Sequence, residues 1–96
     1  MRKEEFCIMP YDGRWSTTRF VGSHRHEVFG AANRHKSIED GLVIFLTPEA
    51  HNMGDNGIHK NREFDLYAKR KAQLRWMEFY GKTVEQFRAR YGKSWI

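Results

Sequence analysis

Three short segments concentrate the side chains that could bind a metal ion: HRHE at 24–27, EAHN at 49–52 and NGIHKN at 56–61. Neutral imidazole is a common ligand of divalent transition metals, and three imidazoles leave coordination positions open for a substrate. If the fold brings these segments together, His26, His51 and His59 form such a site. For each histidine alone, an exposed or hydrogen-bonded imidazole is the simpler interpretation, so the metal hypothesis depends on the three together.

The first half of the chain predicts short strands separated by turns. Strands are expected at 15–22, which is rich in β-branched and aromatic residues, at 26–29, and at 42–46, where the apolar run LVIFL ends at Thr47-Pro48. One helical turn is expected at 37–40, where Ser37 and Asp40 resemble a capping box. The segment PEAHNM at 48–53 predicts a short helix, which begins at a proline and stops at the glycines that follow.

The second half predicts two amphipathic helices. In 60–80 the apolar residues recur every four positions, and the opposite face is basic. Gly81 is the expected C-cap of this helix. Thr83 and Gln86 form a capping box for a last helix that ends at Gly92. The sequence therefore predicts a single α+β domain over 1–96, with short strands first and a helical part at 60–92.

Composition favours a polyanionic partner inside a cell. The 96 residues carry a net charge of +5, which favours binding to DNA or another polyanion. The single cysteine, Cys7, excludes an internal disulfide and fits a reducing compartment. The N-terminal segment has no apolar region typical of a signal peptide, and the run at 42–46 is too short to span a bilayer. We therefore expect a cytoplasmic protein with no membrane partner.

Three ordered motifs resemble a known family. The segments HEVFGAANRHKS, GLVIFLTPEAHNM and NGIHKNREFDL, followed by two helices, resemble the small HNH-type (His-Asn-His) proteins of bacteriophages and prophages over about residues 7–96. Those proteins share runs such as HEVFGG-x-NR, GLVVYLCPECHN and GVHFNRELDL. The resemblance implies a ββα-metal fold that holds one divalent cation, here Zn, Mg, Mn or Ni, and a DNA endonuclease that hydrolyses phosphodiester bonds. The location would be the host cytoplasm if the chain is phage-encoded.

The resemblance also assigns residues. His26, His51 and His59 match the family's metal-site histidines. His26 or Glu27 would be the general base, or Glu27 only an orienting group, unless the register shifts so that His24 is the ligand and His26 the base. Contacts to nucleic acid are expected from residues of the NR and HFN motifs and from the basic helix face: Asn33, Arg34, Asn61, Lys69, Arg70 and Lys71. Asn33 is equally well explained as a turn residue, and the run of basic residues at 69–71 as a solvated helix face.

The chain departs from the family in ways that leave other functions open. Relatives carry two C-x-x-C pairs that hold a structural zinc, and here these positions are Cys7 with Pro10 and Thr47 with Ala50, so we expect that zinc to be lost. Gly41 replaces the usual asparagine before the second strand of the motif. One alternative is a catalytically degenerate HNH scaffold that acts as a binding protein, such as a phage-encoded inhibitor of a host defence complex or a recombination accessory. Another is a nucleic-acid-binding module without metal.

Overall fold

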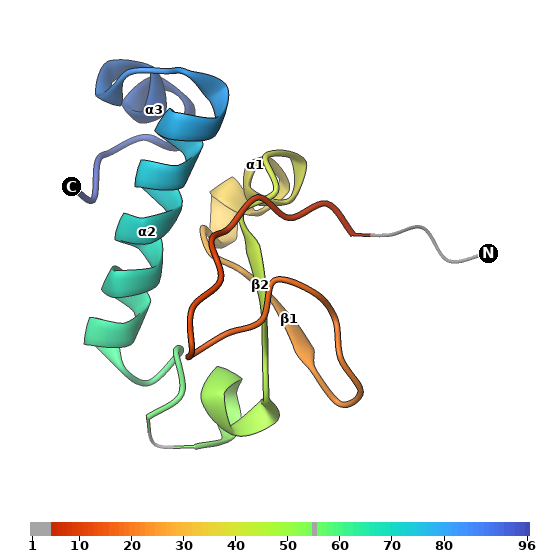
Figure 1. Ribbon diagram of the computed structural model, residues 1–96. Coiled ribbons are helices and arrows are strands. Elements are labelled where there is room, and N and C mark those ends of the chain that lie inside the picture. Colours follow the sequence, from red (N-terminus) through yellow and green to blue (C-terminus); the bar gives the residue numbers. More distant parts are fainter. Residues whose placement is uncertain (1–4, 55) are drawn as a thin grey trace.

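The protein is an α+β fold in which a two-stranded antiparallel hairpin is followed by helices (Figure 1). The computed structural model describes residues 5–54 and 56–96. Its elements, in chain order, are β1 (His24–Glu27), the 3-10 turn η1 (Ala31–Asn33), α1 (Arg34–Glu39), β2 (Val43–Leu46), the π-helical turn η2 (Glu49–Met53), α2 (Arg62–Tyr80) and α3 (Val84–Tyr91). Within the described residues, no helix is long and apolar enough to cross a membrane.

The hairpin pairs the first histidine segment with the apolar strand. His24 lies opposite Leu46 and His26 opposite Ile44, and every residue of β2 is buried. Side chains alternate between the two faces of a strand, so His24 and His26 lie on the same face of β1. The strand predicted at 42–46 is therefore confirmed at 43–46, and it fixes the position of the histidine segment.

Two strand predictions needed correction. In 15–22, Trp15 and Ser16 make only isolated bridges, and the chain then turns. The Ser16 hydroxyl donates to the Thr18 carbonyl at 2.7 Å and so competes with a strand ladder. The strand predicted at 26–29 lies at 24–27, because the amide of Phe29 donates to the Ser37 hydroxyl.

The helical turn predicted at 37–40 is instead the end of α1, which begins at Arg34. The Ser37 hydroxyl donates to the Leu42 carbonyl at 2.7 Å, so it does not form the predicted capping box.

The two C-terminal helices begin and end close to the predicted positions. Gly81, with φ of 62°, is the C-cap of α2, and Gly92, with φ of 94°, is that of α3. Both lie in the left-handed region that glycine adopts without strain. The Thr83 and Gln86 capping box of α3 is present with both of its hydrogen bonds. The segment PEAHNM forms a single π-helical turn, closed by a 3.0 Å bond from the Gly54 amide to the Glu49 carbonyl.

A buried carboxylate joins the helices to the end of α1. Asp40 accepts hydrogen bonds from the Trp76 indole at 2.8 Å, the Tyr91 hydroxyl at 2.7 Å and Arg90 Nε at 2.6 Å. The aromatic side chains of Trp76 and Tyr91 also pack in the core with Phe87. Burial and the neighbouring Asp40 raise the pKa of Tyr91 well above its usual value of 10. These contacts fix α2 and α3 relative to the segment that leads into β2.

Candidate metal centre

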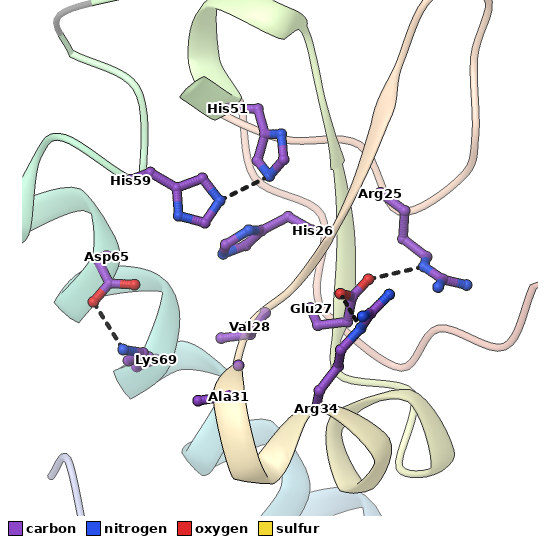
Figure 2. A pocket seen from close by; sticks show the side chains of 11 residues that line it. Arg25, His26, Glu27, Val28, Ala31, Arg34, His51, His59, Asp65 and Lys69 are labelled. Carbon is purple, nitrogen blue, oxygen red and sulfur yellow. Dashed lines mark hydrogen bonds and ion pairs between the residues drawn. The ribbon is translucent and has the colours of Figure 1, made fainter. Parts of the chain in front are cut away.

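Three histidines from separate elements meet beside the hairpin. His26 comes from β1, His51 from η2, and His59 from the loop that precedes α2. One ring nitrogen of each lies within 4.8 Å of the others, and Nε2 of His51 is 2.9 Å from Nε2 of His59. Figure 2 shows the three rings turned toward a common point. The residues predicted as metal ligands therefore form a cluster that could hold a metal ion.

Backbone hydrogen bonds hold His51 and His59 in place. The His59 amide donates to the His51 carbonyl at 3.2 Å, and the adjacent Ile58 amide donates to the Ala50 carbonyl at 2.7 Å. This close approach requires glycine at position 57, because a Cβ there would lie 2.9 Å from the Glu49 carbonyl oxygen and 3.1 Å from that of His51. The π-helical turn and the loop after it thus position both ligands through the main chain.

His26 is buried, but within the described residues its side chain makes no hydrogen bond that would explain its burial, as expected for a metal ligand. It is 6% exposed, and its Nε2 is the one buried side-chain nitrogen or oxygen atom without a hydrogen-bond partner in the described part of the chain. Burial, with smaller effects from His59, His51 and Lys69, lowers the pKa of His26 from 6.5 to about 3. The ring is therefore neutral at pH 7, as a metal ligand must be.

The donor set fits a transition metal. Three neutral imidazoles suit Zn or Ni, whereas Mg prefers oxygen ligands and would be the poorest match among the expected cations. The pKa of His51 is lowered as well, first by burial and then by the neighbouring His59 and His24. Both effects favour the neutral rings that a cation requires, and the orphaned nitrogen of His26 would gain a partner from it.

The triad lines one part of a cavity of about 480 Å³ that also carries ionic side chains. Lys69 lines it and pairs with Asp65 at 2.9 Å. Glu27 projects on the other side of β1 from the triad (Figure 2), where one oxygen accepts a hydrogen bond from Arg25 Nε and the other forms an ion pair with Arg34 Nε, each at 3.0 Å. The cavity therefore combines a candidate metal site with cations that could contact phosphates.

Of the residues predicted to contact nucleic acid, Arg34 and Lys69 line this cavity. Asn33 instead donates from its side chain to the Tyr91 carbonyl at 3.0 Å, and Asn61 is the N-cap of α2, accepting from the Phe64 amide at 3.1 Å. Both asparagines therefore have structural roles in this fold. Arg70 and Lys71 are exposed on α2 and are not among the described residues that line the cavity: Arg25, His26, Glu27, Val28, Gly30, Ala31, Arg34, His51, His59, Asp65 and Lys69.

Sequence reasoning missed Arg25 and Asp65, which line the cavity. It named His24 only as an alternative ligand, whereas the cluster contains His26, and His24 contacts His51 through their Nδ1 atoms at 3.1 Å. The two-residue period of a strand was an available signal, because it places His24 on the same face as His26. The pairing of Asp65 with Lys69 follows the usual i, i+4 spacing on a helix, which was also available from the sequence.

Cys7 is half-buried, and its thiol donates to the Val43 carbonyl at 3.0 Å. Burial raises the pKa of this thiol, which disfavours the thiolate form that binds metals.

Comparisons with other proteins add no assignment: no family model matches the chain, and no curated protein or solved structure matches it either. The similarity to HNH-type proteins stays a prediction from the three motifs.

Proposed function

We propose that the chain is an HNH-like, metal-dependent DNA endonuclease of the ββα-metal type. One observation carries the proposal: a strand, the turn after its partner strand and the loop before a helix bring three imidazoles together, and the buried nitrogen of His26 lacks a partner. An unpaired buried polar atom costs free energy, and such atoms are concentrated where function requires them. A bound cation would explain why three imidazoles, one with an unpaired buried nitrogen, are brought together.

The side chains around the triad have distinct roles in this proposal. His26, His51 and His59 would hold the cation, which when bound polarises the scissile phosphate and stabilises charge on the leaving oxygen. Lys69 lines the same cavity and adds positive charge beside that phosphate. Arg34, whose side chain is 60% exposed, would leave its ion pair with Glu27 to contact a neighbouring phosphate of the bound strand.

Activation of water is assigned to Glu27. His26 is buried and belongs to the ligand cluster, so it is not available as the base. Both oxygens of Glu27 are held in ion pairs with arginines on the other side of β1 from the triad, so one must first be freed and the side chain must turn toward the cavity that it lines. A substrate phosphate that draws Arg34 away would free it, which would couple DNA binding to the start of the reaction.

A different observation, the position of the predicted bases, favours a second function: a catalytically degenerate HNH scaffold that binds a partner. Neither predicted base faces the triad as a free proton acceptor, because His26 is buried and Glu27 is paired with Arg25 and Arg34 on the other side of β1. A scaffold of this kind would keep the metal for stability and use its basic surface for binding. An inhibitor of a host defence complex or a recombination accessory would fit this class.

A cleavage assay separates the two functions. Chelator-stripped protein is incubated with supercoiled plasmid and Zn²⁺, Ni²⁺, Mn²⁺ or Mg²⁺, alongside His51→Ala and the control His35→Ala, which changes an exposed histidine of α1. An endonuclease nicks the plasmid in wild type and control, and loses activity in His51→Ala and in chelator. Glu27→Gln should lower the rate by about 10²- to 10⁴-fold while DNA binding is kept.

A wild-type protein that binds metal and DNA but cleaves nothing with any of the four cations would contradict the endonuclease. The degenerate scaffold would then be tested by isolating a stoichiometric complex with a protein partner that survives His51→Ala.

A further inference from the structure

His24 lies beside the metal centre but is not one of its ligands. Its Nδ1 is 3.1 Å from Nδ1 of His51, and the two rings meet edge to face at 88° with their centroids 5.3 Å apart. The opposite nitrogen of His51, Nε2, faces Nε2 of His59 at 2.9 Å. His51 therefore lies between two imidazoles, with one ring nitrogen directed at each.

The position of one proton decides whether His51 can bind a cation. A neutral imidazole carries one N–H and one lone pair, on different nitrogens. If His24 donates to His51, the His51 proton must lie on Nε2, and no lone pair faces the cluster. If His51 donates from Nδ1 to His24, the lone pair of Nε2 points at the cluster, as a metal ligand requires.

We propose that His24 is a positioning residue: its Nδ1 accepts a hydrogen bond from Nδ1–H of His51 and so presents the Nε2 lone pair of His51 to a divalent cation. The inference rests on the proposed metal centre. Ligating histidines ordinarily donate their second N–H to a carboxylate, a carbonyl oxygen or water, and this partner fixes tautomer and ring orientation. Here the partner is another imidazole, placed on the correct face because His24 and His26 are two residues apart on β1.

Two substitutions separate this role from simple packing. In His24→Asn the amide oxygen can take the place of Nδ1 as an acceptor, whereas His24→Leu removes the acceptor and keeps a side chain of comparable bulk. His35→Leu is the matched control, because His35 is exposed on α1. Loss of a partner of this type lowers metal affinity about 10- to 100-fold. We expect that loss for His24→Leu, affinity close to wild type for His24→Asn, and no change for the control.

The first readout needs no metal. At pH 8, where imidazoles are neutral, two-bond ¹H–¹⁵N spectra of metal-free protein report the tautomer of each histidine. We expect His51 to carry its proton on Nδ1 in wild type and in His24→Asn, and to lose that preference in His24→Leu. The second readout is Zn²⁺ affinity by competition with a chromophoric chelator, with the thermal midpoint of the metal-free protein followed in parallel.

Each outcome is decisive. A wild-type His51 protonated on Nε2, or a His24→Leu protein with wild-type affinity, overturns the positioning role. The positioning role is also overturned if Zn²⁺ affinity falls only in proportion to the stability of the metal-free protein and His24→Asn does not restore it. Packing of the His24 ring would then explain the effect. If wild type takes up no Zn²⁺, the proposed metal centre fails, while the tautomer of His51 still decides whether His24 accepts its proton.

Discussion

Replacing His26 by leucine should change stability in opposite directions with and without metal. In the metal-free protein the substitution removes a buried ring whose Nε2 has no partner. An unsatisfied buried polar group costs about 1 to 3 kcal/mol, so the free energy of unfolding should rise by about 1 to 2 kcal/mol. For a domain of this size that corresponds to roughly 5 to 15 °C in thermal midpoint. With Zn²⁺ at about 100 times the dissociation constant, wild type gains about 2.7 kcal/mol and overtakes the variant, which gains little.

The assay is thermal and urea unfolding followed by circular dichroism, in chelator and in excess Zn²⁺. Gln73→Leu is a matched control, because Gln73 is also a buried polar residue but has its hydrogen bonds made, to Ser94 Oγ at 2.9 Å and from the Trp95 amide at 2.7 Å. That variant should be less stable under both conditions. A metal-free His26→Leu protein that is less stable than wild type would refute the reasoning, because His26 would then have a structural role.

Three further predictions concern the frame around the site. Asp40→Asn should lower the free energy of unfolding by about 2 to 4 kcal/mol in urea titrations, a range reduced for solvent screening because the Arg90 side chain is one-third exposed. Glu39→Gln, at the exposed partner of Arg90, should change it by less than about 0.5 kcal/mol. Ala31 has φ of 52°, so Ala31→Gly should stabilise by about 0.5 to 1 kcal/mol in the same titrations, and a loss would contradict the strain. The raised pKa of Tyr91 means that its contribution is complete below pH 10 and is lost as the pH rises further. Stability should therefore fall more steeply in that range for wild type than for Tyr91→Phe.

The two C-terminal helices could be predicted closely because their signals are local. The four-residue apolar spacing, Gly81, Gly92 and the Thr83 capping box all act within one or two turns, and tertiary contacts did not override them. The buried strand at 43–46 was predictable for a related reason, since its apolar run has no exposed face.

The first strands were harder because distant residues set their limits. The amide of Phe29 bonds to Ser37, and the serine at position 16 uses its hydroxyl within its own turn, so the alternating pattern did not decide where pairing stops. The triad was predicted from the three histidine segments, but its geometry depends on the π-helical turn and on the close approach at Gly57, which no periodicity indicates. The capping role of Asn61 could have been predicted, since asparagine is a favoured N-cap before an amphipathic helix.

The most direct test of the central claim is the metal content of protein purified without a histidine tag. The protein is stripped with chelator, exposed to Zn²⁺, desalted and measured by mass spectrometry, together with His51→Ala and the control His35→Ala. We expect about one equivalent of Zn²⁺ per chain in wild type and control, and almost none in His51→Ala. Wild type without bound metal, or His51→Ala with the same metal content as wild type, would contradict the claim that His26, His51 and His59 form a metal centre.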